Sequence, residues 1–153
     1  MKLTPLLEEI SAKYLYRLAY LMNNYRDPWL RQVEQEFGLT RPEVTILVCL
    51  GNINGITAKD VADVTRQPKN TLSRGALLLE KKGWITRSDD QGDRRRNIMH
   101  ITEQGQKLYE EIMPTYEKAE HVMLTPLDEK DLVDFNRILA KLCEYVAAQT
   151  GND

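Results

Sequence analysis

The stretch 57–102 restricts the fold of this sequence more than any other part, because its structural signals come in a specific order. Cap residues of the Thr, Pro and Gly types predict a short helix over 58–64 and a longer helix over 68–82. Segments rich in β-branched and aromatic residues at 84–88 and 97–102 predict two short strands joined by a polar turn. This order is that of a helix-turn-helix followed by a two-stranded wing.

The sequence on both sides of this stretch is predicted to be helical. Apolar residues recur at helical spacing over 6–25 and again over 128–148, where Asp128 is the expected N-cap. Another helix is predicted from about 103 to 123, with a kink at Pro114. The expected fold class is therefore mainly α, with the wing as a small β element (α+β).

Three local signals divide the region before the helix-turn-helix. Asp27 followed by Pro28 is typical of a helix start, so we expect the first helix to stop and a second to begin there. Gly38 is expected to end that second helix. The sequence Thr-Arg-Pro-Glu at 40–43 resembles a capping box and predicts a helix to about residue 50, with a loop at 51–55.

Charge is distributed unevenly along the chain. The whole sequence has a net charge of −2, but residues 59–100 contain ten Lys or Arg against six Asp or Glu. A basic segment thus lies within an acidic chain, and local charge sets the attraction to phosphate.

One face of the longer predicted helix is apolar and is expected to pack on the shorter helix at Val61, Ala62 and Val64; it consists of Leu72, Ala76 and Leu79, with Leu78 as a further candidate. The outer face places short polar or basic side chains in the first two turns, where a recognition helix contacts bases in the major groove. These candidate base-reading residues are Lys69, Asn70, Thr71, Ser73 and Arg74.

Three consecutive arginines, Arg94, Arg95 and Arg96, follow Asp93 in the predicted wing turn. Adjacent arginines repel one another, so they are seldom placed together for stability alone. A guanidinium at such a position fits the narrow minor groove of DNA, where the potential is most negative. Asp93 is a candidate partner that would hold one arginine while another is presented. Which of the three would enter the groove stays open.

Taken together, these motifs resemble the winged-helix core of MarR-type regulators, and the resemblance covers nearly the whole chain. The matching residues are Val61, Ala62, Leu79, Glu80, Lys82, Gly83, Trp84, Ile85, Arg87, Asp93, Arg94, Arg95, Ile101, Thr102 and Gly105. Two features depart from the family pattern. Gly75 and Ala76 stand where bulkier apolar residues are usual and are expected to loosen the packing of the recognition helix, and Arg96 stands at a position that is commonly small or variable.

The resemblance implies a homodimeric, sequence-specific regulator that binds double-stranded DNA. Long N- and C-terminal dimerisation helices (1–37 and 103–150) would flank a winged helix-turn-helix lobe (40–102) in one continuous fold. Two recognition helices would then bind a pseudo-palindromic operator with half-sites about one helical turn apart. The chain is expected to act as a repressor, with no enzymatic activity and no cofactor.

The resemblance also implies release from DNA by a small aromatic or phenolic acid. Five residues near the N-terminus form the candidate effector pocket: Tyr14, Arg17, Tyr20, Tyr25 and Trp29. Arg17 is the candidate partner of a carboxylate. Such a ligand acts only if it binds the two states of the dimer with different affinity.

Alternative functions stay open at this point. A thiol-based redox regulator would use Cys49 or Cys143, although both lie in apolar helical patterns and favour a structural role in a reducing cytoplasm. A winged-helix module that binds a protein is less expected, because the exposed face at 69–74 has no large apolar anchors. His100 and His121 do not form a ligand-spaced cluster, so no metal is expected, and neither a membrane span nor a secretory leader is indicated.

Overall fold

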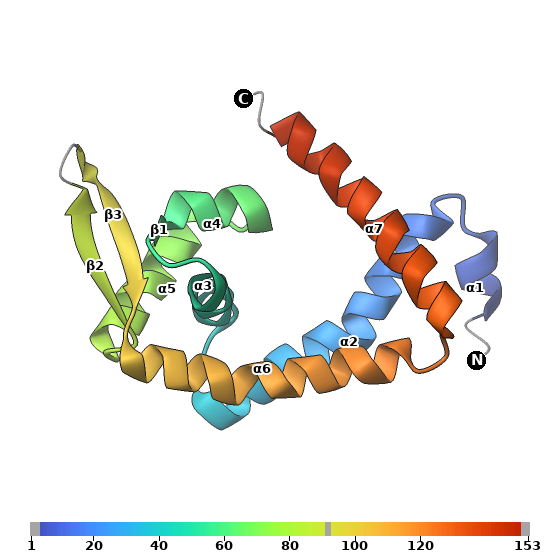
Figure 1. Ribbon diagram of the computed structural model, residues 1–153, viewed down its shortest axis with the longest axis horizontal. Coiled ribbons are helices and arrows are strands. Elements are labelled where there is room, and N and C mark those ends of the chain that lie inside the picture. The colour runs from blue at the N-terminus through green and yellow to red at the C-terminus, as the bar shows by residue number, and fades with distance from the viewer. Residues whose placement is uncertain (1–3, 91–92, 151–153) are drawn as a thin grey trace. The chain divides into compact units, whose positions relative to one another are not determined.

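The computed structural model of the chain describes residues 4–90 and 93–150, and side chains over 7–88 and 97–149. It divides into two compact units, Met1–Ala119 and Glu120–Asp153, which are described separately. The fold is mainly helical with one small antiparallel sheet, as the sequence predicts (Figure 1). The separation into dimerisation helices and a DNA-binding lobe stays a prediction.

The first unit begins with helices α1 (Thr4–Glu9) and α2 (Lys13–Phe37). The expected helix start at Asp27 is wrong, because α2 continues through Pro28. A proline inside a helix costs about 3 kcal/mol. The next turn compensates by burying Trp29 and Val33, and each buried apolar side chain contributes about 1.5–3 kcal/mol. Tertiary packing therefore overrides the local signal.

Trp29 also joins α2 to helix α6 (Glu103–Leu124), which lies far away in the sequence. The indole ring stacks on the ring of Tyr116 with centroids 4.1 Å apart. Its Nε1–H donates to Thr115 Oγ1 at 2.9 Å. The buried indole thus has both an aromatic neighbour and a partner for its polar atom.

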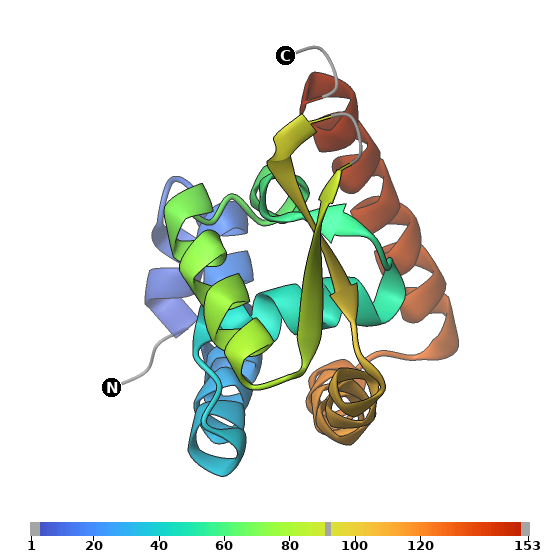
Figure 2. The ribbon, with the colours of Figure 1, turned by 90° about the vertical axis from the view of Figure 1, so that its left-hand side faces the viewer.

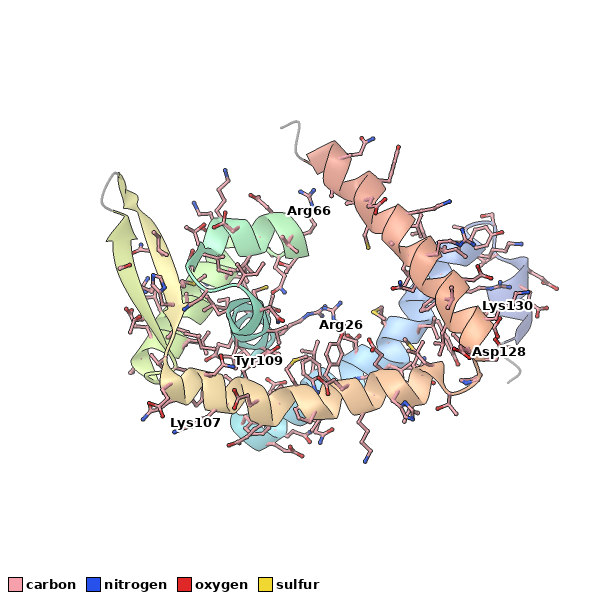
Figure 3. The ribbon with its side chains drawn as sticks, viewed as in Figure 1. Arg26, Arg66, Lys107, Tyr109, Asp128 and Lys130 are labelled. Carbon is pink, nitrogen blue, oxygen red and sulfur yellow. The ribbon has the colours of Figure 1, made fainter. Side chains whose placement is uncertain are left out.

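Helix α3 (Arg41–Asn52) begins with the capping box that the sequence predicts. Gly38 ends α2 in the left-handed conformation. At the far end, α3 includes Gly51, so the expected loop starts two residues later than predicted. Asn52 Nδ2 there donates to the Tyr109 hydroxyl of α6 at 3.1 Å, and Figure 3 labels Tyr109 on the side of α6 that faces α3.

The helix-turn-helix consists of α4 (Ala58–Thr65) and α5 (Lys69–Lys81). Thr57 caps α4 as predicted: Thr57 Oγ1 accepts from Asp60 N, and Asp60 Oδ2 accepts from Thr57 N. Arg66 turns the chain in a left-handed conformation with φ of 58°. The structure confirms the predicted order of helix, turn and helix.

The sheet contains β1 (Ile56–Thr57), β2 (Ile85–Asp90) and β3 (Asp93–Ile101) in the order β1-β3-β2. The sequence did not predict β1, which is only two residues long. Ile85 pairs with Ile101 at the base of the hairpin, and the register shifts between Asp89 and Asp90. Both wing strands are longer than expected, so the predicted turn over 89–96 is wrong: its ends are strand, and β3 already begins at Asp93.

In the first unit, α6 continues through Pro114, and in the second, helix α7 (Glu129–Thr150) follows the predicted cap. Asp128 Oδ1 accepts from Asp131 N at 2.8 Å. Several apolar side chains of α7 are exposed, among them Ile138, Leu142 and Tyr145. Over the described residues, the chain contains no helix with the length and apolar character needed to span a bilayer.

The hydrophobic core lies in the first unit and centres on α3. Its buried side chains come from helices α2 to α6 and from the sheet, and they include Ile46, Leu47, Leu72, Leu79 and Ile112. The recognition helix therefore rests on a well-packed support.

Candidate nucleic-acid interface

The apolar face of α5 packs against the core, as its sequence spacing predicts. Leu72, Ala76 and Leu79 are each at most 2 % exposed. Two details of the prediction are wrong. Leu78 is 44 % exposed, and Val64 of α4, expected to contact α5, is 81 % exposed. Val64 lies in the last turn of α4.

The candidate base-reading residues lie in the first two turns of α5. Lys69, Asn70, Thr71 and Arg74 are exposed, and Ser73 is half-buried. Pro68 begins the helix, and its carbonyl accepts hydrogen bonds from the amides of the third and fourth residues that follow. Figure 2 looks onto the wing and shows α5 next to β2, so both parts of the candidate interface belong to one rigid support.

Gly75 brings α5 close to the N-terminus of α3. A Cβ at this position would lie 3.1 Å from Pro42 Cβ and 3.4 Å from the Glu43 amide nitrogen. The expectation that Gly75 loosens the recognition helix is therefore wrong. A bulkier side chain would push α5 away from α3, and glycine allows the close approach instead.

A buried ion pair fixes the end of α5 to the start of α3. Glu43 is 1 % exposed, and its Oε1 accepts from Lys82 Nζ at 2.7 Å. Its Oε2 accepts from the backbone amide and the hydroxyl of Thr40, at 2.8 and 2.7 Å. Lys82 Nζ also donates to the Gly38 carbonyl, which ends α2. One lysine thus joins three helices.

These contacts determine the ionisation of the buried carboxyl group. Burial raises the pKa of Glu43, but hydrogen bonds from Lys82 and Thr40, with the charge of Lys82, lower it by more. The net pKa lies below its ordinary value, so the carboxylate is charged at neutral pH. A charged, fully bonded carboxylate holds α5 at a fixed angle to α3.

A second ion pair attaches the wing to the recognition helix. Arg87 of β2 donates from Nε and Nη2 to Glu80 Oε2 of α5, at 2.9 and 2.6 Å. The ammonium of Lys82 lies 5.1 Å from the centre of the Trp84 ring at the start of the wing. These contacts join α5 to the wing. The residues that make them all belong to the winged-helix motif found in the sequence: Glu80, Lys82, Trp84 and Arg87.

The base of the wing is joined to α6 through Thr102 and Gly105. Thr102 Oγ1 donates to the Gly83 carbonyl at 2.8 Å and accepts from the Gly105 amide at 3.0 Å. The amide of Thr102 donates to the Trp84 carbonyl at 3.1 Å. A Cβ on Gly105 would lie only 2.0 Å from that carbonyl oxygen. Only glycine fits this junction without a backbone shift.

For the wing arginines, the structure describes the position of the backbone only. Arg94, Arg95 and Arg96 follow the first residue of β3 and belong to that strand. Their side chains lie outside the described residues, as does any pairing between an arginine and Asp93. Their assignment to the minor groove stays a prediction.

The candidate effector residues all lie on α2 and are spread over about half of its circumference. At 100° per residue, Tyr20 and Trp29 lie on opposite sides of the helix. Trp29 is buried and already bonded, and Arg17 Nε donates to the Leu7 carbonyl at 3.1 Å. Tyr14 is 72 % exposed with Lys13 over its ring, while Tyr20 and Tyr25 are half-buried. A pocket made from these five residues stays a prediction.

The cysteines and histidines are not arranged as a reactive centre. Burial raises the pKa of the Cys49 thiol above its ordinary value, which disfavours the thiolate needed for redox chemistry. Cys143 is exposed on α7. Among the residues that the structure describes, no group of three or more His, Cys, Asp or Glu side chains is placed to hold a metal ion.

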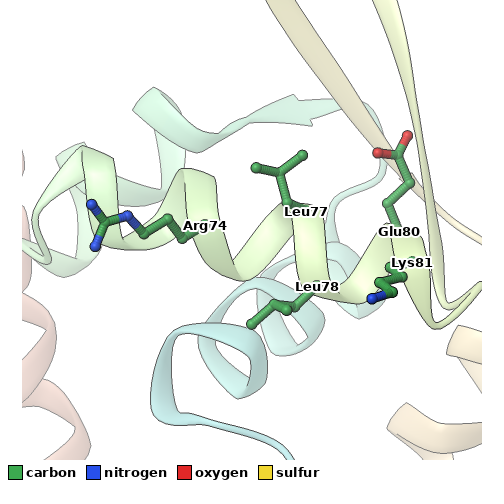
Figure 4. Close-up of a pocket in the computed structure, with 5 residues that line it drawn as sticks. All are labelled: Arg74, Leu77, Leu78, Glu80 and Lys81. Atoms are coloured by element: carbon green, nitrogen blue, oxygen red, sulfur yellow. The ribbon is translucent and has the colours of Figure 1, made fainter.

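One surface of α5 was not predicted from the sequence. Leu77 and Leu78 are 50 % and 44 % exposed, and with Arg74, Glu80 and Lys81 they line a shallow hollow (Figure 4). The signal was present in the sequence, because Leu77 follows Asn70 and Arg74 at helical spacing. The exposed face of α5 thus extends beyond residue 74 to the end of the helix.

Comparison with known proteins shows which family this chain resembles. Residues 37–96 match the sequence profile described as the MarR family. The uncharacterized HTH-type transcriptional regulator YwoH of Bacillus subtilis is 28 % identical over 68 % of this chain and 75 % of its own length. The crystal structure of MarR superposes with a TM-score of 0.81, at 24 % identity, over 95 % of this chain and 97 % of its own.

A further solved structure is that of a MarR-family regulator from Listeria monocytogenes complexed with 26mer DNA. It superposes with a TM-score of 0.79 at 23 % identity, over 89 % of this chain and 90 % of its own. These structures confirm the fold expected from the sequence.

Proposed function

We propose that this chain, which resembles the MarR family over residues 37–96, is a winged-helix transcriptional regulator that binds a specific sequence of double-stranded DNA through α5 and the wing. The two would act together, with α5 in the major groove and the wing arginines in the adjacent minor groove. The similar Listeria protein was crystallised with a DNA duplex, which supports this proposal.

The observation that carries the proposal is the asymmetry of α5. Its inner face is buried on the core, and its outer face presents Lys69, Asn70, Thr71 and Arg74 in the first two turns. These side chains suit base edges and phosphates: Asn pairs with adenine, and Arg or Lys pairs with guanine. The fixed attachment of α5 through Glu43 and Glu80 supports base readout, because hydrogen bonds to bases require a rigid helix.

We further propose that two chains bind together as a homodimer. The exposed apolar side chains on α2 and α7 are the basis, since many of them are large and lie on helices expected to pair. These include Tyr14, Leu15, Leu18, Met22, Leu132, Val133, Ile138, Leu142 and Tyr145. A two-fold dimer would present two recognition helices to two half-sites. Repression follows if the operator overlaps a promoter.

A gel shift with DNA from upstream of the gene for this protein tests the proposed function. We expect a shifted band with the full chain at about 0.1 M salt that persists against excess competitor DNA, because specific binding exceeds non-specific binding by about 10³ or more. The proposal would be contradicted if, for every DNA fragment of the operon, the shifted band disappeared when competitor DNA was added.

Arg94→Ala and Arg95→Ala should each weaken binding to all duplexes by a similar factor. Each removes one phosphate-neutralising charge, so the slope of log K against log salt should become shallower by about 0.9 for each phosphate that is no longer neutralised. The measurement is fluorescence anisotropy at several salt concentrations. Arg137→Ala on α7, an exposed arginine paired with Asp134, is the matched control and should change neither quantity. Unchanged binding in both wing variants would show that the wing does not touch DNA.

A small aromatic acid remains the proposed releasing ligand, with Tyr14, Arg17, Tyr20 and Tyr25 as candidate contacts. The support is the aromatic composition of α2 and the half-buried rings of Tyr20 and Tyr25. A thermal-shift screen of small aromatic acids tests it, because a bound ligand raises the melting temperature by mass action. A hit should also release the chain from DNA.

A further inference from the structure

The most exposed side of α5 carries four residues in one line. At 3.6 residues per turn, Asn70, Arg74, Leu77 and Lys81 fall within about 60° of arc, opposite the buried face. Three of these side chains can hydrogen-bond to DNA. Leu77 cannot, yet it is 50 % exposed between Arg74 and Lys81. On this line, Leu77 is the residue that can offer an apolar contact to DNA.

We propose that Leu77 is a specificity-determining residue that reads the C5-methyl group of a thymine in the major groove. This inference rests on the proposed function and deepens it. Among the groups that base pairs present in the major groove, the thymine methyl is the apolar one. Leu77 lies between two basic side chains, with Arg74 as a candidate base-reading residue and Lys81 as a candidate phosphate contact, so charge complementarity favours DNA at this point.

The spacing along the helix indicates where that thymine should lie. Leu77 is seven residues after Asn70, which corresponds to about 10.5 Å along the helix axis. Base pairs are stacked about 3.4 Å apart. The thymine is therefore expected at most about three base pairs from the base that Asn70 contacts.

The shape of the surface agrees with a small apolar group as the occupant. Leu77 borders a shallow hollow that Arg74, Leu78, Glu80 and Lys81 also line, and Figure 4 shows Leu77 and Leu78 leaving α5 on different sides. Two exposed leucines offer much less surface than the roughly 1,000 Å² of a stable protein interface. Continuity with the base-reading residues therefore favours DNA over a protein partner.

The test compares thymine with uracil, which lacks only the methyl group. The full chain first enriches a duplex from a randomised pool, and this duplex is then resynthesised with one thymine at a time replaced by uracil. Dissociation constants are measured by anisotropy for the wild type, for Leu77→Ala and for Leu77→Met. Val64→Ala is the matched control, because Val64 is an exposed apolar residue of the neighbouring helix.

We expect one thymine per half-site at which uracil weakens wild-type binding about fourfold, the effect of exposing one methyl group. Leu77→Ala should bind both duplexes equally, whereas Leu77→Met and Val64→Ala should keep the difference. The inference is overturned if no uracil weakens binding, or if Leu77→Ala keeps the difference. It is equally overturned if this variant changes only the oligomeric state, which would assign Leu77 to a protein contact. Failure to enrich any duplex would instead reject the proposed function itself, and the inference with it.

Discussion

Gly105→Ala should lower the free energy of unfolding by about 4 kcal/mol, near the upper end for single substitutions. The added Cβ would lie 2.0 Å from the Trp84 carbonyl oxygen and 2.9 Å from Ile101 Cγ1. The nearer atom belongs to the backbone, so it cannot move aside as a side chain would. Relief requires α6 to separate from the base of the wing, which would also break the hydrogen bond between Thr102 N and the Trp84 carbonyl.

Helix propensity alone predicts the opposite result for Gly105→Ala, so the measurement distinguishes the two effects. Alanine is favoured over glycine inside a helix by about 1 kcal/mol, so an unhindered substitution would stabilise the protein. Thermal unfolding followed by circular dichroism measures the effect, and a fall of about 10 °C or more is expected. Gln104→Ala, at the exposed preceding position, is the control and should change the midpoint little. A melting temperature of Gly105→Ala at or above that of the wild type would disprove the close approach.

Lys82→Met should lower the free energy of unfolding by about 2–3 kcal/mol. The substitution removes the cation but leaves Glu43 as an uncompensated carboxylate that is 1 % exposed. Breaking a fully buried ion pair costs about 3–5 kcal/mol, and a smaller loss is expected here because the Lys82 side chain is 34 % exposed. Lys107→Ala, which breaks the exposed pair with Glu103 on α6, is the control and should cost at most about 0.5 kcal/mol.

The same ion pair makes stability depend on pH. The pKa of Glu43 is lower in the folded chain than its ordinary value of 4.5, so its contribution is fully present above that value. The contribution is lost as the pH falls through the lower, folded pKa. Urea unfolding from pH 7 to pH 3 should show this loss in the wild type and a smaller loss in Glu43→Gln. Equal pH dependence in the two proteins would contradict the role of Glu43.

Signals confined to a few neighbouring residues were enough to predict much of this fold. Thr57 with Asp60, Thr40 with Glu43, and Asp128 each cap a helix as predicted, because a cap depends on residues within one turn. The buried face of α5 was also predictable from its spacing. The resemblance correctly singled out Lys82 and Gly105 without giving their partners.

The features that the sequence did not reveal depend on distant contacts. Pro28 lies inside α2 because Trp29 packs on Tyr116, which is far away in the chain. From the local sequence, Gly75 is expected to weaken helix packing. Its role is to allow the close approach of α5 to Pro42, which belongs to another helix. Pairing between β2 and β3 continues through residues such as Asp89 and Asp90, whose types are typical of turns. For the site, helical spacing placed the first two turns of α5 correctly, and the same spacing could also have placed Leu77 on the exposed face of the helix.

Hydroxyl-radical footprinting of the full chain on its enriched duplex tests the central claim most directly. The claim is that α5 and the wing of two chains bind two half-sites of one duplex. We predict two protected patches related by a two-fold axis, with centres about 10 base pairs apart. Protection of a single patch, or uniform protection along the duplex that disappears with competitor DNA, would contradict it.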